Sequence, residues 1–303
     1  MKKYNVLSLF DGISCGQKAF ERAEIPINKY YASEIDNYAI QVTQKNFINT
    51  IQLGDITQIT NSDLDALDKI DIIIGGSPCQ DLSNYKYDRG EVTGFNGEKS
   101  GLFYEYIRIL KHIKPKYFLL ENVASMEDKW KDLISEILGV QPILIDSGLV
   151  CAADRKRLYW TNIPNVTPPL NTGIMIKDII LDPNDVSEKY WYDRPFIYNG
   201  DDKKVQCTID ISGHRHIKEV YNQKFKCNTL LCDGDGGNRQ KKVYQDGRCR
   251  KFTPLEYERM QTLPDNYTDC LSDSRRYSTI GNGWTVDVIA HILSFIKQVI
   301  HNK

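Results

Sequence analysis

The chain has 303 residues, and its 39 Lys and Arg against 40 Asp and Glu give a formal net charge of −1. Hydrophobic residues make up 41% and charged residues 26%, which is ordinary for a soluble globular enzyme and excludes a disordered or collagen-like chain. No apolar run is long enough for a transmembrane helix, and the apolar stretch 6–10 is too short for a signal peptide, so we expect a cytoplasmic protein without a membrane partner.

Strand and helix patterns alternate through the first half of the chain. Apolar and β-branched runs predict strands at 5–10, 30–34, 50–53, 70–74, 117–120, 140–145 and 157–160, and helical spacing predicts helices at 16–22, 37–46 and 104–114. Strands that alternate with helices indicate a doubly wound, largely parallel sheet. Because ligands bind at the carboxyl ends of such strands, we look for function in the segments that follow them.

The pattern changes near Pro164. Residues 194–251 are polar and weakly periodic, and they contain thirteen Lys and Arg against seven Asp and Glu, a local net charge of +6. The cysteines and histidines of this stretch lack the paired spacing of zinc ligands, so free thiols are expected and no metal site is predicted. Regular structure returns with a predicted helix start at 253–256 and a last helix at 286–300.

The segment from Phe10 to Gly16 follows a predicted strand and opens a helix. Glycines let a backbone approach a ligand, and a helix N-terminus favours an anion, although a tight turn without a ligand is the plain alternative. Glu34 ends the next strand and Asp55 the third. An acid at three consecutive strand ends fits an adenosine-bearing cofactor, while the missing G-x-G-x-x-G spacing disfavours NAD and FAD.

Two further segments follow strands and carry reactive side chains. Cys79 comes directly after Pro78 in a loop, where backbone N–H groups could stabilise a nucleophilic thiolate; a structural Pro-Cys pair is the alternative. Glu121 follows four apolar residues, so poor solvation is expected to raise the pKa of its carboxyl group and suit it to general acid catalysis. The alternative is a carboxylate that caps the following helix.

Arg155 and Arg157 precede or open a predicted strand and should project to the same side of an extended chain. They could bind an anion or a carbonyl group, or they could be a solvated charge run. The segment 83–99, directly after the cysteine loop, is predicted to close over a substrate, with a solvated flexible loop as the alternative.

Taken in order, these motifs resemble those of the DNA (cytosine-5)-methyltransferases. The matching segments are 10–16, 77–80, 121–123, 155–157, 250–264 and 281–286, and the likeness extends over 5–163 and 250–293. Segments such as 75–79 and 151–157 lean toward the branch that contains the animal de novo methyltransferases. Asp154 departs from the Gln or Ser that many bacterial members have before the arginine motif.

The resemblance implies an α/β, Rossmann-like S-adenosylmethionine-dependent methyltransferase fold with a mixed, mostly parallel seven-stranded sheet and a small target-recognition domain. Residues 1–165 plus 250–303 would form the catalytic and cofactor-binding domain, and 166–249 the target-recognition region. The implied reaction transfers a methyl group from S-adenosylmethionine to C5 of cytosine in double-stranded DNA and leaves S-adenosylhomocysteine. Cys79 would add to C6 of a flipped-out base, Glu121 would act at N3, and Arg155 and Arg157 would stabilise O2 and hold the acid.

The resemblance also assigns the cofactor site. Phe10 would contact the adenine ring, Glu34 the ribose hydroxyls and Asp55 the adenine amine. The complete implied set is Phe10, Asp11, Gly12, Ile13, Ser14, Gly16, Glu34, Ile35, Asp55, Ile56, Pro78, Asn282, Gly283 and Trp284.

Three other functions remain open from the sequence. The chain could methylate transfer RNA, could be a catalytically silent DNA-binding partner of such an enzyme, or could be a nicotinamide oxidoreductase built on the same sheet. Its residue usage suggests an AT-rich bacterial or phage genome, and a cognate restriction endonuclease is a candidate partner. The recognition sequence and the oligomeric state cannot be read from the chain.

Whole-chain charge shows no basic footprint of the kind expected for nucleic-acid binding. The +6 stretch at 194–251 changes that interpretation, because it concentrates positive charge within the region implied to recognise DNA. We expect charge reversal at Lys241 and Lys242 in this stretch to weaken DNA binding and its salt dependence.

Overall fold

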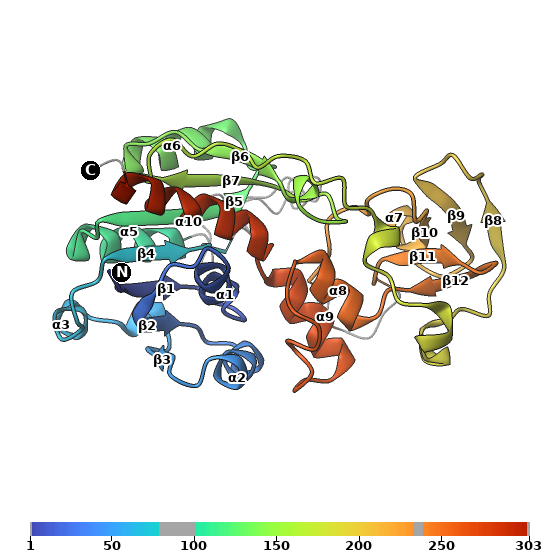
Figure 1. Cartoon of the computed structure of the whole chain (residues 1–303), viewed down its shortest axis with the longest axis horizontal. Coiled ribbons are helices and arrows are strands. Elements are labelled where there is room, and N and C mark those ends of the chain that lie inside the picture. Colours follow the sequence, from blue (N-terminus) through green and yellow to red (C-terminus); the bar gives the residue numbers. More distant parts are fainter. Residues whose placement is uncertain (1, 79–100, 233–238, 302–303) are drawn as a thin grey trace. The chain divides into compact units, whose positions relative to one another are not determined.

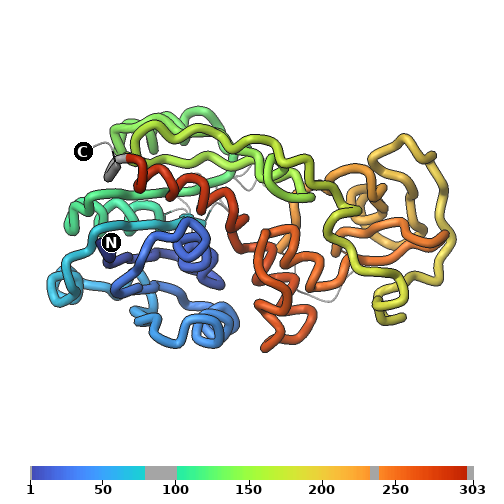
Figure 2. The backbone as a smooth tube through the Cα atoms, in the orientation of Figure 1, coloured from blue at the N-terminus to red at the C-terminus, as the bar shows by residue number. Residues whose placement is uncertain are grey.

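The computed structural model describes residues 2–78, 101–232 and 239–301. The chain forms two compact units, and Figure 2 traces the path of the backbone through both. Unit 1 comprises Met1–Ile145, Lys156–Pro168 and Val288–Lys303, and unit 2 comprises Asp146–Arg155 and Pro169–Asp287. Cys79 and the segment 83–99 lie outside the described residues.

One seven-stranded sheet is found in the described part of unit 1 (Figure 1). Its strands, in the order β3-β2-β1-β4-β5-β7-β6, are β1 (Tyr4–Leu9), β2 (Ile27–Ser33), β3 (Ile51–Gln52), β4 (Ile72–Gly75), β5 (Tyr117–Val123), β6 (Ile143–Asp146) and β7 (Lys156–Thr161). The pairs β1/β2, β2/β3, β1/β4 and β4/β5 are parallel, whereas β5/β7 is antiparallel. The predicted mixed, mostly parallel fold class is confirmed. The strand order reverses between β1 and β4, which is where an open α/β sheet binds its ligand.

Helices flank this sheet (Figure 1). They are α1 (Cys15–Arg22), α2 (Asn37–Asn46), α3 (Asn61–Asp65), α5 (Leu102–Ile113), α6 (Asp128–Leu138) and α10 (Val286–His301), and a 3-10 turn, η1 (Ile56–Gln58), follows β3. The helix predicted at 37–46 has the observed bounds, because the Asp36 side chain accepts from the backbone N–H of Tyr38 and caps its first turn.

Apolar residues on both faces of the central strands explain why the sheet is covered on both sides. Leu7 and Leu9 face one side of β1 and pack in a cluster with Ile73, Phe103 and Trp160. The intervening residues of β1 are buried as well. Strands that are buried on both faces have nearly continuous apolar sequences, and these runs predicted the central strands.

Unit 2 contains a second sheet, with five strands in its described part, in the order β12-β11-β10-β9-β8. They are β8 (Phe196–Tyr198), β9 (Val205–Ile209), β10 (Glu219–Tyr221), β11 (Lys242–Gln245) and β12 (Arg248–Lys251), accompanied by α7 (Arg215–Lys218), α8 (Pro254–Met260) and α9 (Asp273–Asn282). The unit also contains the 3-10 turns η3 (Ser147–Leu149), η4 (Ile176–Asp178), η5 (Pro183–Asp185) and η6 (Glu188–Tyr190). The expectation of weak periodicity over 194–251 missed this sheet, because strands of three to five residues are too short to show alternation.

Buried free thiols contribute to the small core of unit 2. Cys207 and Cys249 pack with Ile209, Ile217 and Val220. Across the described residues, no helix is both long enough and apolar enough to span a membrane.

Candidate active site

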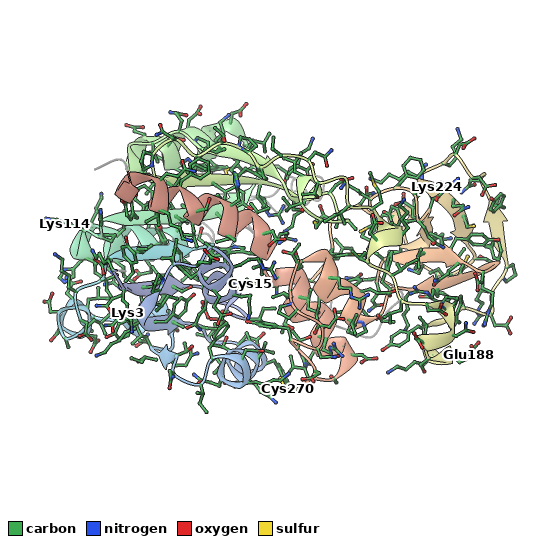
Figure 3. The ribbon with its side chains drawn as sticks, in the orientation of Figure 1. Lys3, Cys15, Lys114, Glu188, Lys224 and Cys270 are labelled. Atoms are coloured by element: carbon green, nitrogen blue, oxygen red, sulfur yellow. The ribbon has the colours of Figure 1, made fainter. Side chains whose placement is uncertain are left out.

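The turn between β1 and α1 has an unusual backbone. Phe10, Gly12 and Ser14 each have φ of 58°, in the left-handed region that glycine tolerates and other residues adopt at a cost. Cys15, labelled in Figure 3, is the first residue of α1. Among the described residues, no atom lies within 4 Å of where a Cβ on Gly12 would stand, so the backbone there is open to a ligand.

The carboxylate of Glu34 gathers backbone N–H groups at the end of β2. Its Oε2 accepts from Gly12 N at 2.7 Å, and its Oε1 accepts from the N–H groups of Ile35 and Asp36 at 2.8 and 2.9 Å. These bonds tie the β1–α1 turn to the end of β2. The side chain of Ile35 beside it is 70% exposed, which is unusual for isoleucine in a folded chain.

The end of β3 adds a second acid. The side chain of Asp55 accepts at Oδ1 from the N–H group and the hydroxyl of Thr57, at 2.9 Å each. Ile56, expected to flank an adenine ring, is only 4% exposed and belongs to the apolar cluster of the sheet. Carboxylates at two strand ends, an exposed isoleucine and an open glycine backbone fit the amine, hydroxyl and apolar groups of an adenosine.

The strand β5 connects the predicted acid to the cysteine loop. The side-chain amide of Asn122 donates to Ser77 Oγ at 3.2 Å and to Ser77 O at 3.4 Å, and both residues are buried. Pro78, which is half-buried, is the last described residue before the gap that contains Cys79. Asn122 therefore fixes Ser77, which precedes Cys79 by two residues in the sequence.

Glu121 lies within β5, since the strand continues to Val123 and does not end at Leu120 as predicted. Its Oε1 lies 2.9 Å from Arg157 Nε, and the two side chains are 11% and 15% exposed. The alternative that Glu121 caps the next helix is wrong, because the N-cap of α6 is Glu127. The resemblance implies that the arginines hold the acid, and the structure places the guanidinium of Arg157 beside Glu121.

The register of the sheet explains this ion pair. Glu121 is opposite Tyr159 and Val123 is opposite Arg157 in the antiparallel β5/β7 ladder. Glu121 and Arg157 are thus diagonal neighbours on one face, within reach of a long side chain.

Arg155 binds different partners from Arg157. It lies just before β7, and its guanidinium donates to the carbonyl oxygens of Gly281 and Gly283 at 3.2 and 3.4 Å. The residue is 9% exposed. The two arginines were predicted to bind an anion or a carbonyl group: Arg155 contacts these two carbonyls, and Arg157 contacts the carboxylate of Glu121.

The glycine segment that Arg155 contacts is closely packed within unit 2. A Cβ on Gly281 would meet Leu231 O at 2.4 Å, so only glycine fits there. Asn282 ends α9 and Gly283 is its C-cap residue. Gln261 donates to the carbonyls of Ile280 and Gly283 at 3.0 and 3.1 Å. Trp284 follows in the same segment, before α10.

The structure contradicts the choice of Lys241 and Lys242 as a DNA-facing surface. Their exposed fractions are 5% and 1%, and Lys242 Nζ donates to the carbonyls of Ile217 and Gln240 at 2.7 and 2.8 Å. Burial lowers the pKa of Lys242 to about 7, with the charges of Lys241 and Lys251 acting in the same direction. A charged run in the sequence does not reveal which side chains turn inward.

Sequence reasoning missed several residues that position this machinery. Tyr30 donates to Asp11 Oδ1 at 2.8 Å, Asn122 anchors Ser77, and Gln261 supports the glycine segment. The role of Tyr30 could have been predicted from the sequence, because a tyrosine inside an apolar strand is expected to be buried and a buried hydroxyl needs a hydrogen-bond partner. The role of Gln261 could not have been predicted, because its side-chain amide donates to backbone carbonyls that lie far from it in the sequence.

The fold and these strand ends define a class of protein. The structure of the Entamoeba histolytica methyltransferase EhMeth has a TM-score of 0.76 to this chain, at 18% sequence identity, and the likeness covers 99% of each chain. Together with the seven-stranded sheet, this establishes the Rossmann-like fold of S-adenosylmethionine-dependent methyltransferases.

The family follows from the sequence comparison. A model of the family described as C-5 cytosine-specific DNA methylase matches residues 4–138 and 158–298, and the chain belongs to this family. Among its relatives, Type II methyltransferase M1.ScrFI of Lactococcus lactis subsp. cremoris is 28% identical, over 99% of this chain and 80% of its own length. Type II methyltransferase M.NlaX of Neisseria lactamica is also 28% identical, over 98% of this chain and 97% of its own length.

The chain is therefore an enzyme that methylates C5 of cytosine in DNA, and the family and fold imply S-adenosylmethionine as the methyl donor. The leaning toward the animal de novo branch is not supported, since these relatives come from bacteria.

Proposed function

We propose that Cys79 is the nucleophile of this reaction, that Glu121 is its acid, and that Arg157 holds Glu121 in place. One observation carries the assignment: adjacent residues of β5 bind Arg157 and Ser77. One strand thus holds Glu121 and contacts Ser77, two residues before Cys79 in the sequence, which supports the assignment. Arg155 would act through the carbonyls of Gly281 and Gly283, in support of the segment that the resemblance assigns to the cofactor.

The chemistry follows from the weak nucleophilicity of cytosine C5. The thiolate of Cys79 forms a bond to C6, and Glu121 donates a proton to N3 so that negative charge does not accumulate on the ring. C5 becomes an enamine-like nucleophile, and S-adenosylmethionine supplies an electrophilic methyl group when bound. After C5 has bonded to the methyl group, loss of the C5 proton to water, departure of the Cys79 thiolate from C6 and return of the N3 proton to Glu121 restore the aromatic ring and the starting enzyme. Since C5 and C6 are stacked inside a duplex, the base must be flipped out.

The adenosine part of the cofactor is proposed to bind at the ends of β1, β2 and β3. Glu34 would accept from ribose hydroxyls, Asp55 from the adenine amine, and Ile35 and Phe10 would cover the ring. The exposed Ile35 and the open backbone at Gly12 support this site. Ile56 would support the adenine site from within the apolar cluster of the sheet, since its side chain is buried there. Roles for Asn282, Gly283 and Trp284 in cofactor binding stay predictions from the resemblance.

Residues 166–249 are proposed as the target-recognition region, with α7 and its flanks on the DNA side in place of the buried lysines. Arg215 is exposed, and the rings of His214 and His216 stack with centroids 5.9 Å apart. Burial lowers the pKa of His216, the charges of Lys241, His214 and Arg239 lower it further, and the charge of Glu219 opposes them, so basic groups outnumber acidic ones around this ring. Such a cluster suits phosphate contacts.

The relatives suggest the biological setting. The named relatives are Type II methyltransferases of bacteria, so we propose that this chain modifies DNA in the cytoplasm of a bacterial or phage-infected cell alongside a cognate restriction endonuclease.

Bisulfite sequencing of DNA from cells that express the chain tests the activity, and labelled methyl transfer to purified DNA tests the residues. Wild type should methylate cytosines in one sequence context, whereas Cys79→Ser and Glu121→Gln should abolish or severely slow transfer. Asp128→Asn, which alters an exposed acid on α6, is the matched control and should retain activity. Equal incorporation by Cys79→Ser and wild type would refute the covalent mechanism. Methylation of transfer RNA without methylation of duplex DNA would contradict the assigned substrate.

A further inference from the structure

The turn between β1 and α1 needs a constraint that holds its backbone. Phe10 and Ser14 both have φ of 58°, a conformation that residues with a side chain keep only where their surroundings enforce it. Ser14 is also the N-cap residue of α1, yet its side chain forms no cap hydrogen bond with its own helix. The hydroxyl of Ser14 instead forms a hydrogen bond with a group outside the helix.

The carboxylate of Asp11 is the partner of that hydroxyl. Ser14 Oγ donates to Asp11 Oδ2 at 2.6 Å, and Tyr30 on β2 donates to Asp11 Oδ1 at 2.8 Å. The backbone N–H of Asp11 donates to Ser33 O at 3.1 Å. One side chain therefore ties the N-cap of α1 to the neighbouring strand across the turn.

This carboxylate is poorly solvated and has an acidic neighbour. Burial raises the pKa of Asp11 to about 6, although hydrogen bonds from Ser14, Ser8 and Tyr30 lower it, and the charge of Glu34 raises it again. Tyr30 and Glu34 are the titratable groups that face Asp11. Burial raises the pKa of Tyr30 well above its usual value, so the phenol remains a donor.

We propose that Asp11 is a positioning residue whose ionised carboxylate locks the β1–α1 turn in the shape that binds S-adenosylmethionine. The inference rests on the proposed function of this turn as the cofactor loop. Asp11 acts through Ser14 and Tyr30, and Glu34 holds the adjoining Gly12 through its N–H group. Protonation of Asp11 removes the charge from both hydrogen bonds, so cofactor affinity should fall as the pH drops through about 6.

Calorimetric Kd values for S-adenosylmethionine and S-adenosylhomocysteine, measured on the full chain between pH 5 and pH 8, test this role. Wild type should bind more weakly at pH 5 than at pH 8. Asp11→Asn should bind about tenfold more weakly at pH 8, with a flatter pH dependence, because it cannot accept two charge-assisted hydrogen bonds. Tyr30→Phe removes one of the side-chain donors to Asp11, so its Kd at pH 8 should lie between the values of wild type and Asp11→Asn.

Asp36→Asn is the matched control. It changes a nearby carboxylate that caps α2 rather than the turn, and asparagine caps helices as well as aspartate does. This variant should keep the Kd of wild type and its pH dependence.

Thermal unfolding separates positioning from a loss of fold. The folded pKa of Asp11 lies above the aspartate value of about 3.9 in an unfolded chain, so its stabilising contribution is complete below that value and is lost as pH rises through about 6. Asp11→Asn should therefore unfold at pH 8 at the same or a higher temperature than wild type.

A wild-type Kd for Asp11→Asn at pH 8 would overturn the inference, as would a wild-type Kd that stays constant from pH 5 to pH 8. If Asp11→Asn does not fold, the test uses Tyr30→Phe and wild type. A wild-type Kd for Tyr30→Phe at pH 8, or a wild-type Kd that does not change with pH, would then overturn the inference. Failure of wild type to bind either ligand at any pH would overturn the proposed cofactor site, and this inference with it.

Discussion

Glu121 shows how one side chain can be prepared by its surroundings. It is buried in β5, yet Arg157 Nε lies 2.9 Å from its carboxylate. A single buried carboxylate without a partner is costly, and the guanidinium offsets that cost while fixing the orientation of the acid. The same ion pair makes Arg157 important for any reaction in which Glu121 must meet a base.

Arg157→Ala should lower the rate of methyl transfer by a factor of about 10² to 10³ through misplacement of Glu121. Single-turnover transfer from labelled S-adenosylmethionine measures this loss. Lys156→Ala, which truncates the exposed neighbouring residue, is the control and should leave the rate unchanged. A rate for Arg157→Ala within about twofold of wild type would show that Glu121 does not depend on the ion pair.

Lys242 should make the stability of unit 2 depend on pH. Burial lowers the pKa of Lys242 to about 7, whereas a lysine in an unfolded chain titrates near 10.4. Between these values the unfolded chain binds more protons, so the free energy of unfolding should rise with pH. Urea unfolding at pH 7, 8 and 9 should give a smaller rise for Lys242→Met than for wild type. Lys203→Met alters an exposed lysine and should keep the wild-type slope; equal slopes for all three proteins would contradict the assignment.

At the scale of elements, α8 is anchored by an ion pair that water does not reach. Arg250 on β12 forms two bonds of 2.8 and 2.7 Å with Glu256, and both side chains are 0% exposed. Glu256 also accepts from Thr253 N in a capping box and from Leu181 N. One carboxylate thus joins a strand, a helix start and a distant loop within unit 2.

Removal of this carboxylate should destabilise unit 2 more than removal of a surface acid. Glu256→Ala should lower the free energy of unfolding by about 3–5 kcal/mol, because it leaves the guanidinium of Arg250 buried and unpaired. Glu188→Ala removes a solvent-exposed ion pair with Arg248 and should cost far less, because water screens the charges of an exposed pair. Glu188 is labelled in Figure 3. Denaturant unfolding compares the two variants, and equal losses would show that the buried pair contributes no more than the surface pair.

At the scale of the whole molecule, the net charge of −1 conceals a local imbalance. Residues 194–251 contain thirteen basic and seven acidic residues, but burial of Lys241 and Lys242 removes two of the basic side chains from the surface. The exposed basic residues that remain for the proposed DNA-facing surface include Arg215. A small number of exposed basic residues limits the electrostatic contribution to DNA affinity, which suits an enzyme that must release its methylated product.

Arg215→Glu should weaken binding to duplex DNA and reduce the slope of log affinity against log salt by about one for each phosphate that the protein no longer neutralises. Fluorescence anisotropy at several salt concentrations measures both quantities. Lys203→Glu makes the same charge change on an exposed residue between β8 and β9 and should have the smaller effect. Identical effects of the two variants would indicate net charge rather than a defined surface, and cofactor affinity should remain unchanged in both.

The sequence predicted the elements of the seven-stranded sheet because their patterns are local. The bounds of 37–46 were correct, since a cap and helical spacing lie within the same few residues. The sheet of unit 2 was missed because its strands are short. The burial of Lys242 was missed because it depends on carbonyl groups of Ile217 and Gln240 that only folding brings to its side chain.

The sequence by itself determined the family and the order of its motifs, because each motif is a contiguous run whose residue types carry the chemistry. Only the tertiary structure decided which side chains meet. The register of β5 against β7 places Arg157 on Glu121, while Arg155, two residues earlier, binds the carbonyls of Gly281 and Gly283. Interactions between residues far apart in the chain depend on strand register and packing, and neither property is written in a local pattern.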